Sequence, residues 1–336
     1  MEREAATIVI VGMHRSGTSL TARWLNECGL ILGENLMAGG VGNPDGHYED
    51  MDFHDFHEKV FNSLDILYGG LALTPEIKLN DSFRDELKLL VDEKNKINTH
   101  WGWKEPRTCL FLNYYNDYLE NPCYLILYRS ANQVVNSLWK RYAESNDIQL
   151  SLNELREEIH KDTVAGFIDA YIEYNEAILK FVETLDQDQY RVQKSLDLIS
   201  SDEDIISWLN DFGFQLNPVR FNSIFDSSKY SEEEVELPYS PAQQKRVLLI
   251  QRQFDSYVQK EMNFDDLHGI KDELLKAVKE QAYTLTKKNK ELTIECQRLN
   301  GVISMKDQVI ASAVKWQESW KKRVFHKWRV ERVIEK

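Results

Sequence analysis

The chain has 336 residues, an ordinary globular composition and a formal net charge of −14. This length is enough for one large α/β domain with an appendage, or for two medium domains. The negative charge argues against a nucleic-acid-binding protein, because a polyanion would be repelled. The charge is uneven, since residues 315–336 hold eight Lys or Arg and three Glu, a net +5 attached to an acidic body.

The cysteines and the apolar segments bear on the compartment. Cys28, Cys109, Cys123 and Cys296 show neither a C-x-x-C pair nor the spacing of a disulfide framework, which favours free thiols in a reducing environment. The apolar run at residues 7–11 is too short for a signal peptide. No segment approaches the ~20 apolar residues that span a bilayer. We therefore expect a cytoplasmic protein.

The chain begins with a predicted strand, turn and helix. Residues 7–11 (TIVIV) are β-branched and apolar, which is typical of a strand buried on both faces of a parallel sheet. Residues 12–19 form a glycine-rich turn. Apolar side chains at helical spacing over residues 20–28 predict a helix that ends at Gly29.

Strands and helices then alternate. Residues 101–107 are predicted to be the end of a second strand entering a loop, and further strands are predicted at 123–128 (CYLILY) and at 190–193. Further helices are predicted at 53–64 after a turn at 43–46, at 132–141, from a capping box at Ser151–Glu154 to about 185, and at 205–212. The alternation predicts an α/β domain over residues 1–263, with a parallel sheet flanked by helices. Ligands of such sheets bind beyond the carboxyl ends of the strands, where Gly12 and Arg129 are expected.

In residues 264–314, mostly apolar residues recur every seven positions in two series. One series holds Leu275, Ala282, Asn289, Cys296, Ile303 and Ile310, and the other holds Val278, Leu285, Leu292, Leu299, Lys306 and Ala313. This pattern predicts a long C-terminal coiled-coil helix, and Asn289 favours a parallel homodimer. The alternative is a lone amphipathic helix that folds onto the domain.

The last segment, residues 315–336, predicts a basic amphipathic helix. Trp316, Trp320, Val324 and Trp328 recur every fourth residue, among lysines and arginines. Such a helix suits an anionic membrane surface, which would place the protein peripherally on the inner face of the cell membrane. The alternative is that the helix docks on its own dimer partner.

The turn at residues 12–19 (GMHRSGTS) has the G-x-x-x-x-G spacing of a phosphate-binding loop, but Thr18 stands where a nucleotide kinase has lysine. Glycines let backbone amides converge on an anion, and the helix after Gly17 directs its positive end toward it. Arg15 supplies a cation, and Ser16, Thr18 and Ser19 supply hydroxyls. Without the lysine and without a metal-binding carboxylate after a strand, the loop favours metal-free binding of a nucleotide phosphate.

At this point the sequence resembles a known family. The segment HRSGTS is similar to the donor loop of bacterial sulfotransferases that use 3′-phosphoadenosine 5′-phosphosulfate (PAPS). Arg129 and Ser137 are similar to the Arg and Ser that hold the 3′-phosphate in that family. Residues 102–107 (GWKEPR) resemble its K-D-P-R segment, and residues 43–50 (NPDGHYED) resemble its N-P-x-G segment. The chain departs from the family at Ala131, where Pro is common, and at Glu105, where Asp is usual.

The resemblance implies a PAPS-dependent sulfotransferase with a P-loop-like fold and adenosine 3′,5′-bisphosphate (PAP) as product. The implied donor-binding residues are His14, Arg15, Ser16, Gly17, Thr18, Ser19, Arg129 and Ser137. Lys104 would contact the sulfonate oxygens, unless it serves only a structural salt bridge. The implied acceptor is a carbohydrate hydroxyl, in a polysaccharide or a lipid-linked glycan.

The catalytic base must be a carboxylate or imidazole that reaches the acceptor hydroxyl. Candidates are Glu49, Glu34 and His47, and Glu49 is favoured because it belongs to a matched segment. His54 and His57 lack metal-site spacing, so we expect a solvated helix face there and no bound metal.

Three other functions compete with this interpretation. A P-loop nucleotide kinase would need the missing lysine and a metal carboxylate. A non-catalytic assembly protein would use the coiled coil and keep a vestigial nucleotide pocket. A glycosyltransferase would leave the pair Arg129 and Ser137 unexplained.

Overall fold

The computed structural model describes residues 5–39, 46–66, 70–71, 76–97, 100–148, 161–226 and 235–261, and the single residues Lys306 and Lys315. The chain divides into two units, residues 1–261 and residues 262–336. Apart from Lys306 and Lys315, the predicted coiled coil (264–314) and the predicted tail (315–336) lie outside the described residues. The predicted capping box at Ser151–Glu154 also lies outside them, as does most of the predicted turn at 43–46.

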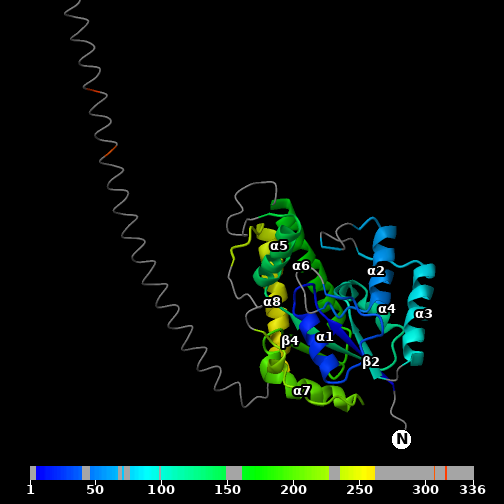
Figure 1. Cartoon of the computed structure of the whole chain (residues 1–336). Coiled ribbons are helices and arrows are strands. Elements are labelled where there is room, and N and C mark those ends of the chain that lie inside the picture. Colours follow the sequence, from blue (N-terminus) through cyan, green and yellow to red (C-terminus); the bar gives the residue numbers. More distant parts are fainter. Residues whose placement is uncertain are drawn as a thin grey trace, which may run out of the picture. The chain divides into compact units, whose positions relative to one another are not determined.

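Four parallel strands form the centre of the first unit (Figure 1). They are β1 (Ala6–Val11), β2 (His100–Lys104), β3 (Pro122–Tyr128) and β4 (Tyr190–Lys194), in the spatial order β2-β1-β3-β4. In register, Ile8 of β1 lies opposite Gly102 of β2 and Cys123 of β3. All residues of β1 are buried, because this strand lies inside the sheet and both of its faces are covered. The predicted parallel sheet is confirmed.

Helices cover both faces of the sheet (Figure 1). One face packs against α1 (Thr18–Glu27) and α7 (Leu198–Asp211), through alternate β1 residues such as Ile8 and Ile10. The opposite face, which includes Val9 and Val11, packs against the remaining helices. These are α2 (Met51–Ser63), α3 (Asp81–Ile97), α4 (Leu112–Asn116), α5 (Ala131–Ser145), α6 (Lys161–Val182) and α8 (Pro241–Glu261). This three-layer arrangement confirms the predicted α/β class.

Short connections place helices directly after strands. Helix α5 follows β3 at Ser130, whose side chain caps it by accepting a hydrogen bond from the amide of Gln133. A 3₁₀ helix at Pro106–Leu110 follows β2 and begins with proline. A second 3₁₀ helix spans Phe221–Ser223. The start of α5 therefore lies at the same edge of the sheet as Arg129.

Three helices, α3, α4 and α8, were not predicted. Helix α4 is short, whereas the buried residues of α3 and α8 do recur at helical spacing, at Leu87 and Val91 in α3 and at Val247, Ile250 and Phe254 in α8. Helix α8 packs on α6 and β4. Within the described helices, none is both long enough and apolar enough to cross a membrane.

Candidate functional site

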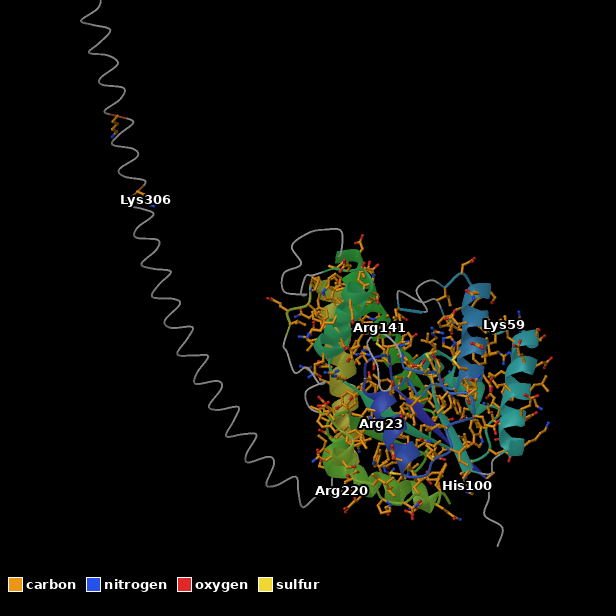
Figure 2. All side chains as sticks on the ribbon, in the orientation of Figure 1. Arg23, Lys59, His100, Arg141, Arg220 and Lys306 are labelled. Atoms are coloured by element: carbon orange, nitrogen blue, oxygen red, sulfur yellow. The ribbon has the colours of Figure 1, made fainter. Side chains whose placement is uncertain are left out.

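The carboxyl ends of all four strands meet at one edge of the sheet. Strand β1 leads into residues 12–17, and the other three lead into Glu105, Arg129 and Ser195. Figure 2 labels Arg141 of α5 above the helix α1, and labels His100, the first residue of β2, toward the opposite edge. In a parallel sheet the edge at the carboxyl ends is where ligands bind.

The loop at residues 12–17 needs both of its glycines. A Cβ atom on Gly12 would lie 2.7 Å from the carbonyl oxygen of Leu127 and 2.8 Å from the Thr18 methyl group. Gly17 has φ +88°, and a Cβ atom there would lie 2.9 Å from Ser195 Oγ. Gly17 is also the N-cap of α1 and provides no capping side chain, so the first-turn amides of α1 face the loop. Amides in this arrangement bind anions.

Ser195 supports this loop and was not found by sequence reasoning. It follows β4, and its buried hydroxyl donates a hydrogen bond to the carbonyl oxygen of Ser16. Its own amide donates to the carbonyl of Tyr128, at 3.2 Å. Its position directly after a strand, like that of Arg129, was the available signal. Ser195 thus ties the loop to the ends of β3 and β4.

Arg15, Ser137 and Arg129 lie together although 114 or more positions separate Arg15 from the other two. Arg15 has φ +69°, and its Nε donates a 2.8 Å hydrogen bond to Ser137 Oγ. Arg129 Nη1 lies 3.5 Å from the carbonyl oxygen of Arg15, and Arg129 Nε donates to Gln133 at 3.2 Å. The hydroxyl of Tyr171 donates to the carbonyl of Arg129 at 3.0 Å. Loop and helix α5 therefore share one cationic cluster.

The cluster has a third guanidinium that sequence reasoning missed. Arg141 lies one helical turn after Ser137 on α5, on the same helix face. Burial lowers the pKa of Arg15, and the positive charges of Arg141 and Arg129 lower it further. Three mutually repelling cations at a strand edge favour an anionic ligand, because its charge would relieve the repulsion.

Lys104 lies beside the loop and holds Glu49. Its Nζ donates to Ser19 Oγ at 3.0 Å and to Glu49 Oε1 at 2.8 Å. The Lys104 side chain is fully buried, and burial lowers its pKa while Glu49 opposes that shift. The salt bridge that was the alternative to a catalytic role for Lys104 is thus present, and the contact with Ser19 places Lys104 at the start of α1.

The three base candidates lie in different surroundings. Glu49 contacts Lys104 directly, and His47, two residues away, is largely buried. Burial lowers the pKa of His47, whereas the nearby Glu49 carboxylate raises it. Glu34 is exposed and lines a separate pocket of about 550 Å³ between α2 and α3, with Asp52 and Lys94. The structure brings Glu49 and His47, but not Glu34, close to Lys104.

The prediction of a solvated helix face at His57 was wrong. His57 is fully buried, and its Nδ1 lies 2.6 Å from Glu105 Oε2. Its Nε2 lies 2.8 Å from the hydroxyl of Tyr115. Burial lowers the pKa of His57, so the imidazole is neutral and Nδ1–H donates to the Glu105 carboxylate. Sequence reasoning missed this contact because Glu105 and Tyr115 lie 48 and 58 positions away.

His14 belongs to the loop at residues 12–17 and lies near Glu105, the partner of His57. Its ring meets Tyr174 edge-on, with centroids 6.0 Å apart. Burial lowers the pKa of His14 to about 4, and the positive charge of Arg107 adds to this effect. His14 is therefore neutral at pH 7. Within the described part of the chain, no group of three or more His, Cys, Asp or Glu side chains could hold a metal ion.

Comparison with known proteins gives structural likenesses only. No family model matches the chain, and no curated relative matches it by sequence. The sulfotransferase domain from the curacin biosynthetic pathway is similar over 74% of this chain and 99% of its own length, with 14% identity and a TM-score of 0.44. The sulfotransferase domain of the Synechococcus PCC 7002 olefin synthase is similar over 76% of this chain and 96% of its own, with 15% identity and a TM-score of 0.42.

A third similar structure is sulfotransferase STF9 from Mycobacterium avium. It covers 76% of this chain and 77% of its own length, with 10% identity and a TM-score of 0.42. Identities and scores at this level are too low to assign an activity. The functional argument therefore rests on the site itself.

Proposed function

We propose that this chain is a sulfotransferase that moves the sulfuryl group of PAPS to a hydroxyl of a carbohydrate acceptor. The observation that carries the proposal is the cluster of Arg15, Ser137 and Arg129, in which Arg15 Nε lies 2.8 Å from Ser137 Oγ, beside the N-terminus of α1, which no side chain caps. Two neighbouring anion sites suit a nucleotide that is phosphorylated at two positions. PAPS is such a nucleotide.

In this proposal, the two ends of the donor bind to different parts of the cluster. The loop amides, Ser16 and Thr18 take the 5′-phosphosulfate at the N-terminus of α1. Arg129 and Ser137 take the 3′-phosphate, and Arg15 lies between the two groups. A kinase interpretation is disfavoured because Thr18 replaces the loop lysine that reaches the γ-phosphate of ATP.

The proposed reaction is an in-line displacement at sulfur. The bond between sulfur and the bridging phosphate oxygen breaks, and a bond between sulfur and the acceptor oxygen forms. Glu49 accepts the proton of the acceptor hydroxyl, and the leaving electron pair goes to the phosphate of PAP. Lys104 and Arg15 stabilise the charge on the sulfonate and bridging oxygens. The contact of 2.8 Å between Lys104 Nζ and Glu49 Oε1 supports these roles, because it places a cation and a base beside each other.

The C-terminal segments supply the remaining part of the proposal. A coiled coil over residues 264–314 would make the protein a parallel homodimer. The basic tail at 315–336 would bind an anionic membrane surface from the cytoplasm, which suits an acceptor glycan that is assembled on a lipid. Flotation of the full chain and of residues 1–314 with anionic vesicles tests the tail, and equal flotation would contradict membrane binding.

A thermal-shift comparison tests the donor, and turnover tests the base. PAP should raise the melting temperature, whereas ATP with Mg²⁺ should not, because it lacks a 3′-phosphate.

Glu49→Gln should lower kcat for sulfate transfer from PAPS to a polysaccharide acceptor by about 10²–10⁴-fold and leave the PAP shift intact. His47→Asn removes the rival base candidate and should leave kcat close to the wild-type value. Stabilisation by ATP with Mg²⁺ but not by PAP would point to a kinase, and PAP binding without transfer would point to a non-catalytic protein.

A further inference from the structure

Four buried polar atoms near the carboxyl end of β2 lack a hydrogen bond among the described residues. They are His14 Nε2, Glu105 Oε1, Arg107 Nε and the Tyr174 hydroxyl; Arg107 Nη1 is paired with Glu58 Oε1. Tyr174 is fully buried, Glu105 is 1% exposed, and the Arg107 side chain is 11% exposed. Buried polar groups in native proteins are almost always hydrogen-bonded, so a cluster of such atoms calls for a ligand or ordered water.

The four side chains lie in one neighbourhood, since the charges of Arg107 and Glu105 act on both His14 and Tyr174. Arg107 Nε lies 3.9 Å from Glu105 Oε1, and the rings of His14 and Tyr174 have centroids 6.0 Å apart. Arg107 also lies over the ring of Phe61, at 5.6 Å. A Cβ built on Gly70 would touch both the ring of Phe61 and the Tyr174 hydroxyl, at 2.8 Å each, so the two side chains meet at this glycine. The side chains of His14, Glu105, Arg107 and Tyr174 therefore form one buried group, called the Glu105 cluster below.

The contacts of Glu105 and Arg107 indicate which ligand the Glu105 cluster takes. Two atoms 3.9 Å apart are too far for a direct hydrogen bond, but one oxygen at about 2.8 Å from each fits between them. That oxygen must accept from Arg107 Nε–H and donate to the Glu105 carboxylate. A hydroxyl group or a water molecule does both, and a carboxylate, phosphate or sulfate oxygen does not.

The charges also disfavour an anionic ligand. Glu58 Oε1 lies 2.8 Å from Arg107 Nη1 and balances its charge. Burial raises the pKa of Glu105, but the hydrogen bond from His57 and the positive charge of Arg107 lower it below its usual value, so the carboxylate is ionised. An added anion would meet this carboxylate without a spare cation. A neutral hydroxyl meets no such repulsion.

We propose that His14, Glu105, Arg107 and Tyr174 form a subsite that binds a second, non-reacting hydroxyl of a polyhydroxylated acceptor. The subsite adjoins the proposed reaction site, because Lys104 and Glu105 are consecutive and His14 belongs to the donor loop. A sugar ring could thus present one hydroxyl to Glu49 and another to the Glu105 cluster. This inference rests on the proposed function and specifies how that site recognises its acceptor.

The test measures how a simple sugar binds to the full-length protein saturated with PAP. The probe is methyl β-D-glucopyranoside, and cyclohexanol is the control with one hydroxyl on a similar ring; affinities are measured by ligand-observed NMR. Tyr174→Phe removes only the unpartnered hydroxyl, so the fold and PAP affinity should be unchanged. We expect sugar affinity to fall about threefold to tenfold and cyclohexanol binding to stay as it is. Tyr124→Phe, which removes a hydroxyl bonded to Asn116 at 2.8 Å, should not change sugar affinity.

Arg107→Gln provides a second variant, with melting temperature and PAP affinity as checks of folding. Arg107→Gln should lower the affinity for the sugar at least as much as Tyr174→Phe does. Equal sugar affinity in wild type and Tyr174→Phe, or no measurable sugar binding, would overturn the subsite and leave ordered water as the occupant. If the wild-type protein does not bind PAP, the proposed function itself is overturned, so the two failures are distinguishable.

Discussion

His14 is a titratable residue whose environment makes a clear prediction at the scale of a single side chain. Burial lowers its pKa from 6.5 to about 4 in the folded protein. The unfolded chain therefore binds a proton that the folded chain does not, and stability is full above pH 6.5 and falls between about pH 6.5 and 4. The loss from this group is on the order of 3 kcal/mol.

Urea unfolding across this pH range checks the prediction. The free energy of unfolding of His14→Gln should fall less steeply between pH 6.5 and 4 than that of the wild type. Burial also lowers the pKa of His57, so His57 contributes part of the pH dependence of stability that remains in the variant. Parallel curves for wild type and variant would show that His14 is protonated as easily in the folded protein as in water.

Individual site residues were predictable where a local pattern defines them. Gly17 and Arg15 belong to a loop with recognisable spacing, and Arg129 follows an apolar strand. Ser195 and His57 were missed, because their roles depend on contacts with Ser16 and Glu105 that lie far apart in the sequence. Tertiary neighbours of this kind leave no periodic trace in a sequence.

At the scale of elements, the turn from β1 to α1 depends on Gly17. Alanine there would adopt φ +88° and would place its Cβ 2.9 Å from Ser195 Oγ. Gly17→Ala should lower the free energy of unfolding by about 1–3 kcal/mol and weaken PAP binding, because the loop amides would shift. Chemical denaturation and calorimetry measure the two effects.

Gly29 offers a matched control at the other end of α1. It has φ +103°, but a Cβ atom there would meet nothing within 4 Å. Gly29→Ala should therefore carry the backbone cost alone and leave PAP affinity unchanged. Equal PAP affinity in the Gly17→Ala and Gly29→Ala variants would contradict the proposed role of the loop.

The elements themselves were predicted where their pattern is strong. Strand β3 (Pro122–Tyr128) is an unbroken apolar run, and α5 begins at a capping serine, Ser130. Helices α3 and α8 were missed although their buried residues recur at helical spacing, at Leu87 and Val91 in α3 and at Val247, Ile250 and Phe254 in α8. Their packing on other helices decides their structure.

At the scale of the whole molecule, the division at residue 261 predicts that the first unit folds alone. A protein of residues 1–261 should be a folded monomer that binds PAP with wild-type affinity, because the cluster lies inside that unit. The full chain should be a dimer by light scattering, and Leu285→Asp with Leu292→Asp should return it to a monomer. A full chain that is monomeric would contradict the coiled-coil dimer.

The central claim is that Arg15 and Arg129 hold one nucleotide with two phosphorylated ends, and calorimetric titration with PAP tests it most directly. Arg15→Ala and Arg129→Ala should each weaken PAP binding about 10- to 100-fold, since each removes charged hydrogen bonds to a phosphate. Arg220→Ala, which removes a cation paired with Asp202 at 3.2 Å, is the control and should bind PAP like the wild type. PAP affinities for Arg15→Ala and Arg129→Ala that equal the affinity of Arg220→Ala would contradict the claim.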